Sequence, residues 1–171
     1  MDYPVIIIAE EGEMKLVNTY LPQLLKEDRS NVVITGVGAI NIIRSLKHLD
    51  KDATVINIGY AGSANYEIGT VALPAQAKLN HPNVNYPEPQ LQLDTKLTED
   101  ILTRNGIKIV KTVCYSNCDF VLQSDYSDCV FDMELAFIAA LGFRNLYSVK
   151  IVSDNLSLHS YREYGSGVEA N

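Results

Sequence analysis

Residues that bind metals or form disulfides are scarce in this chain. Its 171 residues include three cysteines and three histidines, at Cys114, Cys118, Cys129, His48, His81 and His159. The cysteine count is odd, no two cysteines form a CxxC motif, and none stands at ligand spacing from a histidine. This pattern argues against both a disulfide framework and a zinc site. We therefore expect reduced thiols and no bound metal.

Positive charge is also scarce. Fourteen Lys and Arg residues stand against twenty-one Asp and Glu residues, which gives a formal net charge of −7. Because the basic residues are scattered, nucleic acid and anionic membranes are unfavourable partners. The N-terminal apolar run is short and acidic residues follow it, unlike a signal peptide or a membrane span. The sequence predicts a cytoplasmic protein that binds neither nucleic acid nor membrane.

Apolar residues make up 47% of the chain and alternate between strand and helix patterns. Short apolar runs typical of buried strands occupy residues 5–9, 31–35, 54–58, 70–73, 107–114 and 146–152. Helical spacing marks residues 39–49 and 132–141, with a looser pattern from Met14 that Pro22 interrupts. Thr98 is expected to cap a further helix that stops at Gly106, and the prolines and asparagines of residues 80–92 indicate a loop.

This order of elements predicts the fold class. Strands that alternate with helices are typical of a mostly parallel sheet covered on both faces. No internal repeat, low-complexity tract or linker divides the chain, so residues 1–171 are expected to form one domain. The sequence predicts an α/β fold with a mixed, mostly parallel central sheet and helices on both faces.

Polar or glycine-rich segments follow five of the apolar strands. In parallel α/β sheets, ligands bind beyond the carboxyl ends of the strands. We therefore expect these segments to meet at one rim and to form the binding site. They are residues 9–13, 35–38, 59–63, 116–121 and 153–155.

Several of these signals also have ordinary structural explanations. GVGAIN, residues 36–41, has Asn41 where a dinucleotide-binding motif needs its third glycine, so NAD is not expected and a tight turn explains both glycines. Glu10 and Glu11 suit a solvated helix N-terminus, where acids interact favourably with the helix dipole. Asp154 taken alone fits a cap or an Asx-turn.

Glu134 is harder to explain in this way. Its neighbours Met133, Leu135, Ala136 and Phe137 leave little of the predicted helix in water. An acid packed among apolar residues needs hydrogen-bond donors, and the hydroxyl groups of a ligand are such donors. Glu134 is therefore a candidate binding residue.

Taken together, these segments resemble the nucleoside phosphorylase/nucleosidase superfamily, and within it most closely the methylthioadenosine/S-adenosylhomocysteine nucleosidases. The resemblance runs from residue 5 to about residue 155 and rests on IIIAEEGEM, TGVGAIN, INIGYAGSANYEIGTV, SNCDFV, FDMELAFIAAL and VKIVSDN, in that order. It implies a nucleoside phosphorylase-like fold, a small-molecule nucleoside as ligand, no cofactor and a homodimer.

The resemblance also implies roles for individual residues. Glu13 would activate water, and Asp154 would protonate the leaving purine base. Met133 and Glu134 would hold the ribose. Base binding falls on Phe120, Val121 and Ser153, and the remaining pocket positions are Gly38, Gly59, Tyr60, Ala61 and Gly62. This chemistry requires a raised pKa for Asp154, whereas Glu13 and Glu134 must stay ionised.

Hydrolysis is favoured over phosphorolysis. Phosphorylases of the superfamily bind phosphate through arginines after the first strand and within the third. Here these places hold AEEGEM and Asn57, and without guanidinium groups a dianion has no counter-charge among so many carboxylates. The alternatives are a purine nucleoside or uridine phosphorylase, and a nucleoside-binding protein without catalytic activity.

The chain departs from the superfamily pattern at four places. Tyr60 replaces a small hydroxylated residue, and Lys150 stands where an arginine is common. The stretch between Glu13 and Thr35 is short for the usual hairpin, and the chain ends at Asn171 without the usual long terminal helix. These departures leave open both the substrate and whether catalysis is retained.

Overall fold

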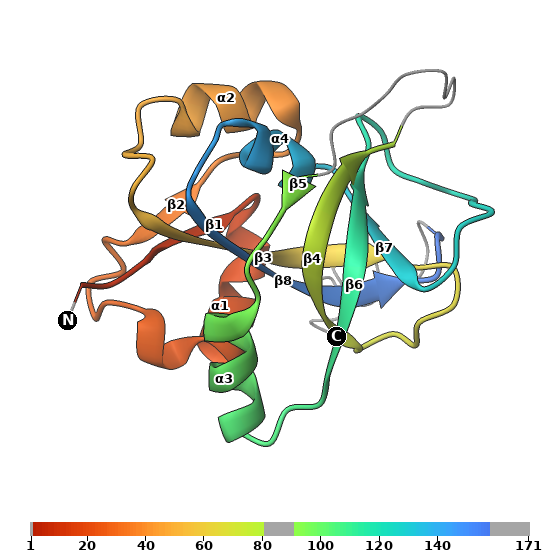
Figure 1. Ribbon diagram of the computed structural model, residues 1–171, viewed down its shortest axis with the longest axis horizontal. Coiled ribbons are helices and arrows are strands. Elements are labelled where there is room, and N and C mark those ends of the chain that lie inside the picture. The colour runs from red at the N-terminus through yellow and green to blue at the C-terminus, as the bar shows by residue number, and fades with distance from the viewer. Residues whose placement is uncertain (1, 81–90, 158–171) are drawn as a thin grey trace.

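The computed structural model describes residues 2–80 and 91–157 of the chain. His81, His159, most of the proline-rich loop and the C-terminal segment, about which the sequence raises expectations, lie outside these residues. Eight strands are present in the described part: β1 Val5–Ile8, β2 Val32–Ile34, β3 Thr54–Gly62, β4 Val71–Leu79, β5 Leu91–Gln92, β6 Ile109–Ser116, β7 Cys129–Asp132 and β8 Asn145–Asp154 (Figure 1). The helices are α1 Met14–Tyr20, α2 Ala39–Leu46, α3 Lys96–Arg104 and α4 Leu135–Ala140, with short 3-10 turns at Glu11–Glu13 and Pro22–Leu24.

The strands form one mixed sheet in which parallel pairs predominate. The order is β2-β1-β3-β7-β6-β4-β5, and β8 pairs with both β3 and β4. The expected mixed, mostly parallel sheet is therefore present, but strands β3, β8, β4, β6 and β7 close into a ring, which the sequence did not predict.

The unequal lengths of the strands explain the closure. The short β1 pairs with β3 only as far as Asn57. Farther along β3, at Gly62, the neighbouring strand is β7, which pairs there through Phe131. The register between β4 and β6 also shifts between Pro74 and Gln76, and such irregularities increase strand bending. Bent, twisted strands can close a sheet into a barrel.

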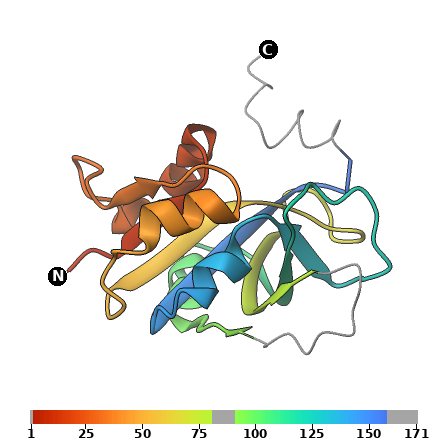
Figure 2. The ribbon, with the colours of Figure 1, turned by 90° about the horizontal axis from the view of Figure 1, so that it is seen from above.

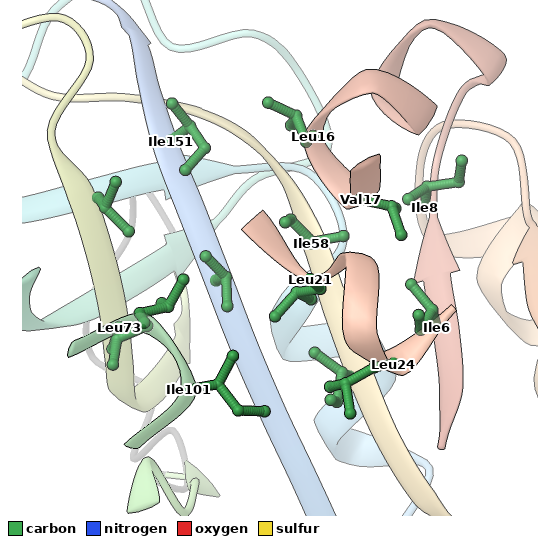
Figure 3. Packing of buried hydrophobic residues seen from close by; sticks show 14 of the residues in the cluster. Ile6, Ile8, Leu16, Val17, Leu21, Leu24, Ile58, Leu73, Ile101 and Ile151 are labelled. Atoms are coloured by element: carbon green, nitrogen blue, oxygen red, sulfur yellow. The ribbon is translucent and has the colours of Figure 1, made fainter. Parts of the chain in front are cut away.

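Helices cover both sides of the sheet, as the alternation of strand residues requires. Ile6 and Ile8 of β1 belong to a core that includes side chains of α1 and α3 (Figure 3). Ile7, which points the other way, belongs to a second core that includes side chains of α2 and α4. On that second side α2 and α4 contact each other (Figures 1 and 2). Each buried strand thus contributes to two apolar layers.

The structure corrects three local predictions. Thr98 does not cap α3: Thr95 is the N-cap, and Thr98 is buried inside the helix, where its hydroxyl group donates to the Thr95 carbonyl oxygen over 3.1 Å. Strand β7 lies in a region where no strand was expected. The helix expected at residues 132–141 is shorter, because Asp132 ends β7 and Glu134 is the N-cap of α4.

No helix among the described residues is long and apolar enough to cross a membrane.

Candidate active site

A pocket lies beyond the carboxyl ends of β1, β3 and β8 and encloses about 570 Å³, part of it open to solvent. All five segments expected at the rim contribute to it, and β7 with the start of α4 adds a sixth. Its lining is Ala9, Glu10, Glu13, Val37, Tyr60, Ala61, Gly62, Asp119, Phe120, Val121, Phe131, Asp132, Met133, Glu134, Ser153, Asp154 and Leu156.

Glu13 lies on the short turn after β1 and is buried. Its Oε1 accepts hydrogen bonds from the backbone N–H of Ala9 at 2.9 Å and of Glu10 at 3.2 Å, and its Oε2 accepts one from the Tyr60 N–H at 2.9 Å. Burial raises the pKa of Glu13, although the charge of Lys150 and these three donors act in the opposite direction. The carboxyl group is thus fixed in orientation and binds a proton more readily than an exposed glutamate.

Two of the predicted glycines allow pocket acids to approach the backbone. A Cβ at Gly59 would lie 2.5 Å from Oε2 of Glu13, and one at Gly62 would lie 2.8 Å from Oδ1 of Asp154. At both positions a side chain would force the acid out of its present place. Gly62 lines the pocket, whereas Gly59 lies behind Glu13 and does not line it.

Asp154 ends β8 and is 1% exposed. Its Oδ2 accepts a hydrogen bond from the Ser153 hydroxyl at 2.8 Å, and its Oδ1 accepts one from the Leu156 N–H at 2.9 Å. Burial raises the pKa of Asp154 despite these donors. Asp154 therefore has the raised pKa that a general acid needs.

Glu134 stands at the start of α4 and reaches across to the turn after β2. The backbone N–H of Gly38 donates to its Oε2 at 3.1 Å. Gly38 has φ = +89°, a conformation that favours glycine. Gly38 was predicted to line the pocket, but it is not among the lining residues and instead binds the carboxyl group of Glu134 through its backbone N–H. Burial raises the pKa of Glu134 to about 7, with further contributions from Asp132 and Glu13, against the charge of Lys150 and the Gly38 N–H.

The expectation that Glu134 stays fully ionised differs from its raised pKa of about 7, whereas for Glu13 the structure gives only an upward shift of the pKa, and its ionisation stays a prediction. Burial raises both pKa values, and Asp132 and Glu13 raise that of Glu134 further. Glu13, Glu134 and Asp154 come from distant parts of the sequence and line one pocket, whose lining among the described residues contains no Lys or Arg. Near neutral pH, Glu134 is present in both protonation states.

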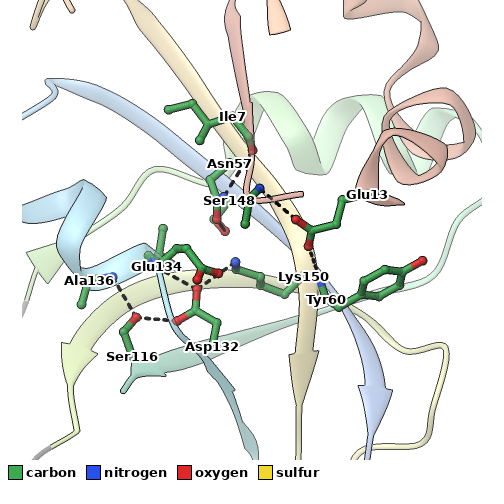
Figure 4. A network of polar contacts seen from close by, with 12 residues as sticks. Ile7, Glu13, Asn57, Tyr60, Ser116, Asp132, Glu134, Ala136, Ser148 and Lys150 are labelled. Atoms are coloured by element: carbon green, nitrogen blue, oxygen red, sulfur yellow. Dashed lines mark hydrogen bonds and ion pairs between the residues drawn. The ribbon is translucent and has the colours of Figure 1, made fainter. Parts of the chain in front are cut away.

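An inner polar network lies beneath this pocket (Figure 4). Lys150 of β8 is 1% exposed, and its Nζ lies 2.8 Å from Oδ2 of Asp132. The same Oδ2 accepts the Leu135 N–H at 2.9 Å, and Oδ1 accepts the hydroxyl group of Ser116. Sequence reasoning did not assign this pair. The sequence did contain a signal for an ion pair: Lys150 stands within the apolar strand segment VKIV, and a buried charge needs a partner of opposite charge.

The charges in this pair stabilise each other. Burial alone would raise the pKa of Asp132, but the Lys150 ammonium and the hydrogen bonds from Lys150, Ser116 and Leu135 lower it below its ordinary value. Burial would likewise lower the pKa of Lys150, but Asp132 and the neighbouring acidic groups raise it. Both groups are charged at neutral pH.

The remaining candidate residues also lie at the pocket. Phe120, Val121, Met133, Ser153 and Ala61 line it. The backbone of Tyr60 binds Glu13, while its phenol ring extends away from Lys150 and Glu134 (Figure 4) and packs in the core on the α1 side. The ring therefore leaves the space around the carboxyl groups open.

Among residues 2–80 and 91–157, no cluster of three or more His, Cys, Asp or Glu side chains has an arrangement that could hold a metal ion. The acids at the pocket face a lysine and backbone N–H groups instead. Such an arrangement can bind hydroxyl groups and move protons.

No model of a protein family matches the sequence, and no curated protein matches it. Solved structures do. The methylthioadenosine/S-adenosylhomocysteine nucleosidase of Neisseria meningitidis, in complex with methylthio-immucillin-A, is 19% identical, with a TM-score of 0.75 over 97% of this chain and 93% of that one. The corresponding nucleosidase of Colwellia psychrerythraea, in complex with adenine, is 20% identical, with a TM-score of 0.72 over 94% and 87%.

A third similar structure is a futalosine hydrolase mutant of Helicobacter pylori, 14% identical, with a TM-score of 0.71 over 97% of this chain and 93% of that one. These likenesses span nearly the whole of each chain at low identity. At such identity they establish the fold. The expected nucleoside phosphorylase-like fold is thus confirmed, and the chain has the fold of the methylthioadenosine/S-adenosylhomocysteine nucleosidases.

Proposed function

We propose that this protein hydrolyses the N-glycosidic bond of a purine nucleoside or thionucleoside, with a ligand similar to methylthioadenosine or S-adenosylhomocysteine. The observation that carries the proposal is the convergence of Glu13, Glu134 and Asp154 on one pocket beside Phe120 and Met133. The complexes of similar proteins with adenine and with methylthio-immucillin-A also support it.

The proposed reaction needs one acid and one base. Cleavage of the bond between the anomeric carbon and the purine nitrogen leaves the electron pair on the base, and Asp154 supplies a proton to the imidazole nitrogen. Water adds to the anomeric carbon and gives its proton to Glu13. The raised pKa of Asp154 suits the first step, and the three N–H donors that orient Glu13 suit the second.

The other residues would position the substrate. Glu134 accepts the ribose hydroxyl groups, which favours its ionised form, and Met133 packs against the sugar. Phe120 stacks on the base, and the main chain of Val121 contacts its edge. Ser153 holds the carboxyl group of Asp154 through their hydrogen bond.

Water is a better nucleophile here than phosphate. The pocket lining among the described residues contains no Arg or Lys. Asn57, at the position where phosphorylases carry an arginine, is buried and bonded to the Ile7 carbonyl oxygen at 3.3 Å and to the Ser148 hydroxyl at 3.2 Å. It therefore has no route to a phosphate ion in the pocket.

The deciding experiment measures base release from methylthioadenosine, S-adenosylhomocysteine, adenosine and inosine, with and without phosphate. We expect release without phosphate, and the corresponding ribose as the second product. Strict dependence on phosphate would favour a phosphorylase. Binding of adenine by calorimetry without any turnover, unchanged in Asp154→Asn, would favour a nucleoside-binding protein.

Homodimer formation is a second part of the proposal, drawn from the resemblance. Sedimentation velocity of the whole chain tests it directly. A species of twice the 19.0 kDa chain mass is expected, and a monomer at micromolar concentration would contradict it.

A further inference from the structure

The carboxylate of Asp132, at the edge of the pocket, pairs with Lys150 and accepts two further hydrogen bonds. Three donors reach Asp132 from three separate elements: the Ser116 hydroxyl at the end of β6, the Leu135 N–H at the start of α4, and the Lys150 ammonium on β8. Ser116 is fixed in turn, because its Oγ accepts the Ala136 N–H at 2.9 Å. Asp132 thus has little freedom to move toward a ligand.

The two pocket glutamates near this pair are held differently. Glu13 and Glu134 accept hydrogen bonds only from neutral backbone N–H groups among the described residues. Lys150 affects the pKa of each through space. A lysine side chain is flexible, and without Asp132 its ammonium could pair with either glutamate.

We propose that Asp132 is a positioning residue: by binding the Lys150 ammonium, it prevents this cation from pairing with Glu13 or Glu134, and both carboxyl groups stay available to the ligand. The inference rests on the proposed function for its purpose, but the geometry that carries it does not depend on which reaction occurs. Asp132 lines the pocket, but its carboxyl oxygens are already bound by Lys150, Ser116 and the Leu135 N–H, so it acts through Lys150.

The charge environment of Glu134 provides a measurable signature. The groups that affect its pKa are Asp132 and Glu13, which raise it, and Lys150 and the Gly38 N–H, which lower it, in addition to burial, which raises it most. Replacing Asp132 by asparagine removes one negative charge and releases the ammonium. Both changes lower the pKa of Glu134, by about one unit or more for a cation that approaches to pairing distance.

The test is a pH titration of the Glu134 side-chain carboxyl group by carbon NMR in protein labelled at glutamate, with the signal assigned by its loss in Glu134→Gln. In the unaltered protein Glu134 is expected to titrate near pH 7. In Asp132→Asn it should titrate about one unit or more lower. Asp52→Asn, which removes an exposed partner of Arg144, is the matched control and should leave the titration unchanged.

A double variant keeps the test decisive if Asp132→Asn does not fold. Asp132→Asn with Lys150→Met removes both charges, and replacement of a whole buried pair is often tolerated. Because the two opposing influences vanish together, Glu134 should titrate close to its original pH. A fall of a full unit in the double variant would show that Lys150 is not the agent and would overturn the proposal.

Two further outcomes would also overturn it. One is an unchanged Glu134 titration in folded Asp132→Asn, and the other is titration near pH 4.5 in the unaltered protein. The titration needs no substrate, so failure of the nucleosidase assay leaves it standing as a test. If the proposed function also holds, the acid limb of kcat/KM should move with the Glu134 titration in each variant, a response that a purely structural role of Asp132 would not produce.

Discussion

Asp132 and Glu134 stand two residues apart in the sequence, but the structure surrounds them very differently. Asp132 receives three donors, one of them an ammonium, and its pKa is lowered. Glu134 receives one backbone N–H, and its pKa is raised to about 7. Both are buried. The difference shows that the number and charge of the donors decide whether the pKa of a buried acid is lowered or raised.

The same distinction separates two regions of the molecule. The inner network of Asp132, Lys150 and Ser116 connects β7, β8, β6 and α4. Its two charged groups bind each other, and Ser116 and backbone N–H groups complete the network. The pocket acids Glu13, Glu134 and Asp154 keep raised pKa values and remain able to exchange protons. Substitutions in the inner network should therefore affect stability, and those at the pocket should affect activity.

The largest effect is expected at the pocket. Asp154→Asn removes the proposed proton donor to the leaving base and, under the proposed function, should lower kcat/KM for methylthioadenosine by about 100- to 10,000-fold, the range for general acid catalysis. Folding stability should change little, because an asparagine carbonyl can still accept the Ser153 hydroxyl or the Leu156 N–H. The measurement is initial rates together with a urea unfolding curve. A large loss of stability with unchanged activity would reverse the roles assigned to the two regions.

The inner network should show the opposite response. Asp132→Asn breaks the buried ion pair and makes the Lys150 ammonium rearrange toward a pocket glutamate, so it should lower the free energy of unfolding by up to about 3–5 kcal/mol. Glu134→Gln is the matched comparison: it keeps an acceptor for the Gly38 N–H and removes an acid disfavoured by burial, so at neutral pH stability should not fall and should rise by up to about 3 kcal/mol. Equal losses in urea denaturation would contradict the distinction.

The pH dependence of stability should reveal the pocket acids. The pKa of Glu134 is raised from 4.5 to about 7 in the folded state, so the folded protein binds more protons than the unfolded chain between these values. Stability therefore falls as the pH rises through this window, by up to about 3 kcal/mol for this group. Glu13 and Asp154 act in the same direction.

Glu134→Gln should flatten this slope in urea denaturation between pH 5 and pH 8. The lowered pKa of Asp132 has the opposite sign, and its contribution is lost only as the pH falls below its ordinary value of 3.8. A slope that the substitution leaves intact would show that Glu134 is not the group responsible.

The smallest effect is expected at an exposed ion pair. Arg144 Nη1 lies 2.6 Å from Oδ1 of Asp52, a shorter contact than the buried pair, but both side chains are mostly exposed. Asp52→Asn should lower stability by less than about 1 kcal/mol, because solvent screens the attraction. Comparing the stability loss of Asp52→Asn with that of Asp132→Asn shows whether burial or the distance between the charges determines the stability that an ion pair contributes. Similar losses for the two variants would mean that distance decides.

The positions of most elements could be read from the sequence because their signals are local. The apolar runs of β1, β2 and β8 are confirmed as strands, and Pro22 does interrupt the helix that begins at Met14. Strand β7 was missed because it is only four residues long and runs directly into the apolar pattern of α4. Thr98 was mistaken for a cap because Thr95, three residues earlier, offers the same side chain.

The sequence by itself determined which segments meet, because strands that run parallel bring their carboxyl ends to the same edge, and polar residues after apolar runs mark those ends. The roles assigned to the site residues stay predictions. Only the tertiary structure decided that the sheet closes on itself, that Asp132 belongs to a strand and binds Lys150, and that burial raises the pKa of Glu134. These properties depend on distances and burial among residues far apart in the chain, and no local pattern encodes them.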